Sequence, residues 1–201
     1  MKTFQYNEEE ILQEIFPERF ADIDLNGARI KGTSIGGFLV EIGAADGIDN
    51  SNSYDLIKHH GWSGLLVEPH PGYYMDLLHL YAQNPNVTLS HYAITKALGR
   101  KQLGIDGQCS SLIYPKSVSV EVQCVTLTTL FELYRVPEQF NFLSIDCEGE
   151  DMNVLRSLDW DRYSIDVVCV EHSMPKEELD SFMASKDYKL FDRNLGNSFY
   201  T

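Results

Sequence analysis

The sequence predicts an α/β fold with a doubly wound, mostly parallel sheet. Apolar runs of strand length alternate with longer segments of helical periodicity. Several of these runs are apolar on both faces, as in a parallel sheet that helices cover on each side. At 201 residues, without internal repeats or a linker rich in Pro, Gly or Ser, the chain is expected to be one domain with one sizeable core.

Residues 1–36 are predicted to form an N-terminal extension that is partly helical and partly irregular. Helical periodicity covers residues 8–20, where apolar side chains recur on one face and Pro17 lies near the end. The alternation of strands and helices begins after this extension.

The first half of the domain starts with a buried strand at 38–42. A helix is expected at 51–60, with Ser51 or Asn52 as its candidate N-cap and Gly61 as its stop. The other elements of this half are strands at 65–67 and 87–92 and a helix at 73–83.

An inserted β element is expected at 101–126, where the alternation of strands and helices along the chain is interrupted. Within it, apolar and polar residues alternate over 118–124, which is typical of a strand with one wetter face. The elements after it are helices at 128–134, 151–157 and 176–185, strands at 142–145 and 167–170, and a C-terminal antiparallel hairpin of 188–191 with 198–200.

Carboxylates stand where the apolar strands end. The first strand carries Glu41 near its end and runs into a turn of small residues, Gly43–Gly47, and the second strand ends at Glu68. Small residues let the backbone pass close to a bulky ligand. A carboxylate at a second strand end accepts hydrogen bonds from both hydroxyls of a ribose. The pattern therefore predicts a cofactor built on adenosine at the carboxyl edge of the sheet.

Three sequence blocks carry a resemblance to a known family. They are Gly43-Ala44-Ala45-Asp46-Gly47, Gly61-Trp62-Ser63-Gly64-Leu65-Leu66-Val67-Glu68-Pro69 and Asp146-Cys147-Glu148-Gly149-Glu150-Asp151. In this order they closely resemble the FkbM family of methyltransferases, over a region from about residue 37 to the C-terminus. The resemblance implies a class I methyltransferase fold, with a seven-stranded sheet whose last strand is antiparallel. It also implies S-adenosylmethionine-dependent O-methylation of a sugar or small metabolite.

The resemblance and the strand-end pattern together name the residues expected to bind S-adenosylmethionine. Glu41 and the turn after it are expected to face the methionine part and the ribose, and Glu68 to take the ribose hydroxyls. Asp46 either orients the turn or reaches the amino group of the cofactor, and Asn52 either contacts the cofactor or caps a helix. The full set is Glu41, Gly43, Ala45, Asp46, Gly47, Asn52, Glu68, Pro69, Ser110 and Asp146.

Transfer of a methyl group to an alcohol calls for a general base near the reacting hydroxyl. His172 follows the strand at 167–170 and has a side chain that titrates near neutral pH, so it is the first candidate, with Asp146 as its rival. On the first assignment, His172→Ala is expected to abolish turnover and to leave cofactor affinity nearly unchanged.

A divalent cation such as Mg²⁺ is a further candidate ligand. Four carboxylates lie within the Asp146–Asp151 block, and such crowding is uncommon without a nearby cation. Asp146, Glu171 and His172 are the expected ligands, because they fall at neighbouring strand ends. The alternative is that Glu150 and Asp151 only face the start of the following helix, where acids are favourable.

The composition narrows the set of partners. The net charge of −14 disfavours nucleic acid and anionic membranes, and no apolar run is long enough to cross a bilayer. Four scattered cysteines do not form a zinc or disulfide pattern. The N-terminus lacks the layout of a secretory signal. We therefore expect a cytoplasmic monomer or homodimer that acts on a small-molecule or saccharide acceptor.

The sequence supports three alternative functions less well than a methyltransferase. A NAD-dependent oxidoreductase normally shows Gly-x-Gly-x-x-Gly, which the Gly43–Gly47 turn lacks. A phosphatase with an Asp-x-Asp pair would need an aspartate where Glu148 stands. A binding module that holds an adenosyl cofactor without catalysis stays open, because the acceptor is not identified.

Overall fold

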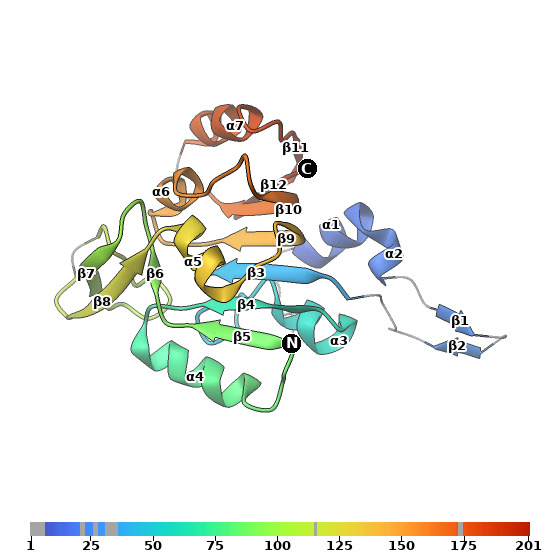
Figure 1. Ribbon diagram of the computed structural model, residues 1–201, viewed down its shortest axis with the longest axis horizontal. Helices are drawn as coiled ribbons and strands as arrows, with labels where there is room; N and C mark the ends of the chain where they lie inside the picture. Colours follow the sequence, from blue (N-terminus) through green and yellow to red (C-terminus); the bar gives the residue numbers. More distant parts are fainter. Residues whose placement is uncertain (1–6, 21–22, 26–27, 31–35, 115, 173–174) are drawn as a thin grey trace.

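A computed structural model describes residues 7–20, 23–25, 28–30, 36–114, 116–172 and 175–201. Its centre is a seven-stranded sheet with the order β11-β12-β10-β9-β3-β4-β5 (Figure 1). The strands are β3 (Phe38–Ile42), β4 (Ser63–Val67), β5 (Val87–Ser90), β9 (Gln139–Ile145), β10 (Ser164–Glu171), β11 (Leu190–Arg193) and β12 (Asn197–Tyr200). Strands β10, β9, β3, β4 and β5 are parallel, whereas β12 is antiparallel to both β10 and β11. The predicted fold class and its C-terminal antiparallel hairpin are confirmed.

Helices cover both faces of this sheet, and each face has its own apolar core. The first core joins α5 (Leu127–Tyr134), α6 (Asp151–Arg156) and α7 (Lys176–Ala184) to one face. The second joins α1 (Glu8–Ile15), α3 (Tyr54–His60) and α4 (Pro71–Tyr81) to the other. Neighbouring residues of one strand enter different cores, as Leu39 and Val40 do, because side chains alternate across a strand. This explains why the strands are apolar on both faces.

The N-terminal segment begins with two helices instead of one. The helix predicted over 8–20 divides into α1 and α2 (Pro17–Phe20), because Pro17 cannot continue the hydrogen-bonding of the first helix. Leu12 and Phe16 are buried, and the ring of Phe16 meets Trp62 edge to face. A two-stranded hairpin of β1 (Ile23–Leu25) and β2 (Ala28–Ile30) follows.

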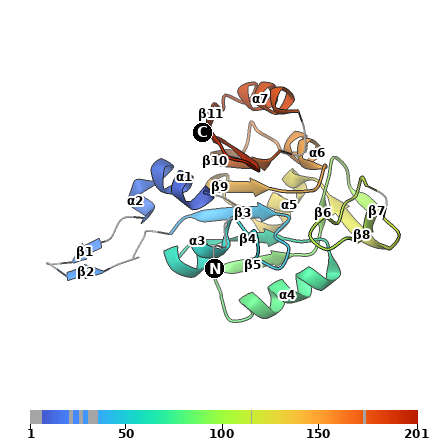
Figure 2. The ribbon, with the colours of Figure 1, turned by 180° about the vertical axis from the view of Figure 1, so that it is seen from behind.

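The inserted β element predicted at 101–126 belongs to a three-stranded sheet. This sheet has the order β6-β8-β7 and consists of β6 (Ala93–Ile94), β7 (Gly99–Gly104) and β8 (Ser119–Val125). It lies at the opposite end of the molecule from β1 and β2 in both views (Figure 1 and Figure 2). The arrowheads of β3 and β9 point toward it, so it lies beside the carboxyl edge of the main sheet (Figure 1). The strand predicted at 87–92 is shorter than expected, because the chain leaves β5 after Ser90 and enters this second sheet.

The helices among the described residues are too short or too polar to span a membrane.

Candidate active site

A cavity of about 320 Å³ opens at the carboxyl edge of the main sheet. Its floor and walls come from the turns after β3, β4 and β9, from the end of β10, and from the loop between β7 and β8. Open α/β sheets bind their ligands at this edge, and the volume falls within the range of small-molecule sites. The cavity is therefore the candidate active site.

The turn after β3 lies against the neighbouring strand ends. The backbone N–H groups of Gly43 and Ala44 both donate to the carbonyl of Val67, at 2.9 and 3.1 Å. Gly43 has a φ of +87°, and a Cβ there would lie 1.8 Å from the carbonyl oxygen of Asp146. Glycine is thus required by the close approach of two turns. Gly43 and Ala45 line the cavity, whereas Gly47 packs against the side chain of Leu77.

Glu68 lies at the end of β4, is only 6% exposed and lines the cavity. Its Oε2 accepts a hydrogen bond from the Ala45 N–H at 2.9 Å, and its Oε1 accepts one from the His70 N–H at 2.7 Å. Burial raises the pKa of Glu68 to about 7, against the lowering effect of these two bonds, and repulsion from Glu41 adds to the rise. Each carboxylate oxygen keeps a lone pair for a ligand. Pro69 lines the cavity beside it.

Glu41 lies beneath the turn and does not line the cavity. Its carboxylate accepts hydrogen bonds from the hydroxyls of Ser53 and Ser51, at 2.5 and 3.0 Å, and from the Asn52 N–H at 2.7 Å. Burial raises the pKa of Glu41 to about 7 despite these bonds. The helix predicted from residue 51 therefore begins only at Tyr54, because the three residues before it are bound to Glu41.

Two more of the expected cofactor ligands are occupied within the protein. The Oδ1 of Asp46 accepts hydrogen bonds from the N–H groups of Ile48 and Asp49, both at 2.9 Å, so it orients the turn. The side chain of Asn52 donates to the hydroxyl of Ser144 at 3.0 Å. Neither Asp46 nor Asn52 lines the cavity.

The buried carboxylate of Glu41 predicts a pH-dependent stability. Its pKa of about 7 in the folded protein exceeds the 4.5 of a free glutamate, so the folded state binds more protons between these values. Stability therefore falls as the pH rises through this window, and the loss is complete above about pH 7. The shift corresponds to about 3 kcal/mol at most.

We expect Glu41→Gln to be destabilised less by rising pH than the natural protein. The free energy of unfolding of the variant, relative to that of the natural protein, increases between pH 5 and pH 8. The reason is that the introduced amide has the same shape as the carboxyl and stays neutral, whereas Glu41 loses its proton in this range. Urea unfolding across that range measures the difference, and the exposed Glu14→Gln serves as the control. Parallel pH profiles for Glu41→Gln and the natural protein would contradict the prediction.

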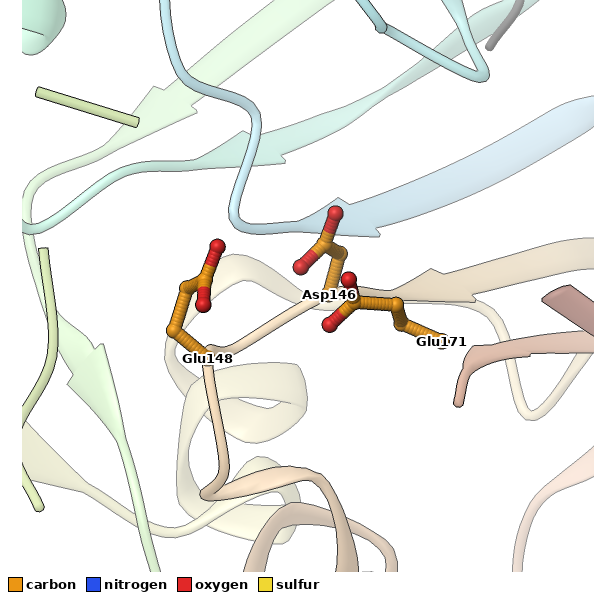
Figure 3. A group of neighbouring side chains, drawn as sticks. All are labelled: Asp146, Glu148 and Glu171. Carbon is orange, nitrogen blue, oxygen red and sulfur yellow. The ribbon is translucent and has the colours of Figure 1, made fainter. Parts of the chain in front are cut away.

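Three carboxylates converge on the cavity. Asp146 and Glu148 follow β9 and Glu171 ends β10, and one oxygen from each lies within 4.8 Å of the others (Figure 3). Burial and repulsion by Glu171 raise the pKa of Asp146 well above its usual value, and the two side chains share a hydrogen bond. Burial likewise raises the pKa of Glu171 and of Glu148. Asp146 and Glu171 therefore form a pair that holds a proton more tightly than ordinary carboxyls.

The other two acids of the Asp146–Asp151 block have partners within the protein. Glu150 pairs with the Nζ of Lys101 at 2.8 Å, and this bond and those from Thr95 and Asn153 lower its pKa against the effect of burial. Asp151 begins α6 and accepts hydrogen bonds from backbone N–H groups of the preceding loop, at 2.8 and 3.2 Å. The four acids thus separate into two that are held by partners within the protein, of which Glu150 also lines the cavity, and two that converge on the cavity with Glu171.

His172 does not line the cavity. Its Nε2 lies 2.7 Å from the hydroxyl of Ser198 on β12, and its backbone N–H donates to the carbonyl of Gly196. Burial, with the positive charges of Lys176 and Arg193, lowers the pKa of its imidazole. Since adjacent residues of an extended strand point to opposite sides, Glu171 faces the cavity and His172 faces the hairpin. The metal ligand set predicted from the sequence is corrected accordingly, with Glu148 in the place of His172.

The loop between β7 and β8 closes one side of the cavity. Ser110 lines it, although its hydroxyl donates to the carbonyl of Gly107 within the same loop. Gln108 reaches across to the turn after β3, where its Oε1 accepts a hydrogen bond from the Asn50 side chain at 3.0 Å. The side-chain amides of Asn50 and Gln108 both line the cavity and were not among the predicted cofactor ligands.

Tyr73 is another lining residue that the sequence predictions did not include. It lies in the first turn of α4, where the Nδ1 of His70 accepts its backbone N–H at 3.2 Å. The signal was its position in the first turn of the helix that follows Glu68 and Pro69.

The comparisons with known proteins agree with the family resemblance of the sequence. Residues 41–191 match the family model of the methyltransferase FkbM domain. None of the curated proteins matches the sequence.

Solved structures share the fold at low sequence identity. The FkbM methyltransferase of Methylobacillus flagellatus is 12% identical, with a TM-score of 0.54 over 83% of this chain and 44% of that one. A human methyltransferase 10 domain containing protein is 11% identical, with a TM-score of 0.50 over 96% and 79% of the two chains. The Methanococcus jannaschii fibrillarin pre-rRNA processing protein is 10% identical, with a TM-score of 0.50 over 86% and 69%. The chain thus spans less than half of the Methylobacillus protein.

Proposed function

The chain belongs to the FkbM methyltransferase family, and we propose that it transfers a methyl group from S-adenosylmethionine to a hydroxyl of a sugar or small metabolite. The observation that carries this proposal is the buried Glu68 carboxylate at the end of β4. It lies in the same cavity as the tight turn at Gly43–Ala45.

The residues present fit this donor. Glu68 offers free lone pairs to the ribose hydroxyls, and the turn brings the backbone to the cavity with no side chain larger than a methyl group. The donor carries a sulfonium, an ammonium and a carboxylate, hence a net positive charge. The lining includes several carboxylates, which suits a cation.

The acceptor hydroxyl needs a base. When bound, S-adenosylmethionine supplies an electrophilic methyl group. The Asp146–Glu171 pair lies in the cavity, and its raised pKa makes it a stronger proton acceptor near neutral pH than an ordinary carboxylate. We assign the base role to this pair, because His172 is directed to Ser198 instead.

Calorimetry tests the donor. We expect S-adenosylmethionine and S-adenosylhomocysteine to bind and NAD not to bind. Binding of NAD alone would favour an oxidoreductase. Donor binding without turnover on a panel of sugars and hydroxylated metabolites would favour a module that holds the cofactor without catalysis.

A divalent cation in the carboxylate trio is the second candidate for this site, with Asp146, Glu148 and Glu171 as ligands. We place it second because Asp146 and Glu171 share a hydrogen bond, whereas a cation would bind both in their charged form. We expect turnover to be unchanged by EDTA. Loss of activity in EDTA that added Mg²⁺ restores would instead place a magnesium ion on these carboxylates.

The remaining proposals concern partners and location. The strongly acidic chain, with a net charge of −14, favours a small-molecule or saccharide acceptor over nucleic acid or an anionic membrane. We propose a monomer or homodimer that works in the cytoplasm.

A further inference from the structure

The lining of the cavity carries acidic side chains and no basic ones among the described residues. Its described lining contains no Lys, Arg or His side chain. Its carboxylates are Asp49, Glu68, Asp146, Glu148, Glu150 and Glu171.

Most of these carboxylates have a partner in the protein. Glu150 pairs with Lys101, Glu68 accepts two backbone N–H groups, and Asp146 and Glu171 bind each other. Glu148 differs from them, because its partner is the weakly donating thiol of Cys109.

No cation pairs directly with Glu148 among the described residues. The charge of Lys116 acts to lower the pKa of Glu148, but that ammonium is already paired with Asp106, at an Nζ–Oδ2 distance of 2.5 Å. The Glu148 carboxylate therefore faces the cavity with unmet capacity for a positive charge.

An aromatic ring accompanies this carboxylate. Gly149 follows Glu148 with a φ of +100°, and a Cβ at Gly149 would lie 3.2 Å from the ring of Tyr114. The hydroxyl of Ser111 fixes this arrangement, since it donates to the Glu148 carbonyl at 2.8 Å and accepts from the Tyr114 N–H at 3.3 Å. Tyr114 is 53% exposed. The backbone that carries Glu148 is thus held in place by Ser111 and by the ring of Tyr114, although Tyr114 itself does not line the cavity.

We propose that the methyl acceptor carries a protonated amine beside its hydroxyl groups, as an amino sugar does, and that Glu148 binds this amine. The proposal rests on the proposed function and names its acceptor class. Carboxylates attract ammonium groups. An acceptor with a phosphate or carboxylate would meet like charges and no lining cation. The neutral hydroxyl of the same acceptor remains available to the Asp146–Glu171 pair.

Three matched sugars test the acceptor class. Saturation of the protein with S-adenosylhomocysteine is established first by calorimetry. Binding of D-glucosamine, D-glucose and D-glucose 6-phosphate is then measured by NMR titration in EDTA. We expect glucosamine to bind about tenfold more tightly than glucose, and the phosphate to bind more weakly than either. Added salt should reduce the preference.

Variants locate the amine site. Glu148→Gln should bring the glucosamine-to-glucose ratio close to one, while Glu177→Gln, an exposed carboxylate on α7, should keep it. Thermal unfolding checks that the variants are folded.

The outcomes separate the two proposals. Failure of S-adenosylhomocysteine to bind overturns both the donor and this inference. Equal affinities for the three sugars in the saturated protein, or no binding of any, overturn only the amine acceptor. A preference that survives in Glu148→Gln, or that needs Mg²⁺, also overturns it.

Discussion

Asp146→Asn is expected to lower the turnover number by about 10²-fold or more and to change the affinity for S-adenosylhomocysteine by only a few-fold. The asparagine keeps the shape of the side chain and can still donate a hydrogen bond to Glu171. It removes the carboxyl whose pKa is raised by burial and by repulsion from Glu171, and with it the stronger proton acceptor of the pair. General bases contribute effects of about this size. Initial rates at saturating donor measure the turnover number, and calorimetry measures the affinity for S-adenosylhomocysteine.

Two further variants make this test specific. Glu171→Gln should reduce turnover to a similar extent, and the double variant should cost little more than either single one, because the two acids act as a unit. His172→Ala should keep turnover within about twofold, since its imidazole bonds to Ser198 and does not line the cavity. Loss of turnover in His172→Ala with full activity in Asp146→Asn would return the base role to the histidine.

Glu68→Ala is expected to raise the dissociation constant for S-adenosylmethionine by about 100-fold. Hydrogen bonds to a charged group contribute about 1.5–3 kcal/mol, and this carboxylate is positioned to accept two ribose hydroxyls. Glu68→Gln, which keeps one acceptor oxygen, should raise the constant by about tenfold. Calorimetry measures both values.

The matched control is Glu41→Gln, because Glu41 is also a buried glutamate with a raised pKa near a strand end. We expect this variant to stay within a few-fold of the natural affinity, since the hydrogen bonds to its carboxylate come from the segment 51–53 and Glu41 does not line the cavity. Thermal unfolding of Glu68→Ala is also needed, because Glu68 holds the N–H groups of Ala45 and His70. A larger loss in Glu41→Gln than in Glu68→Gln would contradict the assignment of the ribose site.

Neighbouring residues show how far sequence reasoning reaches. Glu41 and Glu68 look alike in the sequence, as acids at the ends of apolar strands. The structure directs Glu68 into the cavity and Glu41 into a buried group of hydroxyls. The difference depends on Ser51 and Ser53, which approach Glu41 only after the chain has turned back from the sheet. In the sequence alone, these two serines look like ordinary residues at the start of a helix.

The Asp146–Asp151 block shows the same limit. Its four acids suggested either a cation or a helix terminus, and both kinds of environment occur in one segment. Asp151 folds back onto its own loop, and Glu150 reaches Lys101 on β7 of the second sheet. The partner of Glu150 lies 49 residues away, so its presence could not be foreseen from local spacing.

The amino-acid sequence by itself determined the doubly wound sheet, the edge where ligands bind and the family. These follow from the periodicity of apolar residues and from short blocks whose backbone requirements are local, such as the glycine at Gly43. Only the tertiary structure decided which polar side chains face the cavity. A carboxylate or imidazole at a strand end has no preferred direction until strand pleating and distant hydrogen-bond partners select one, as they do for Glu171 and His172.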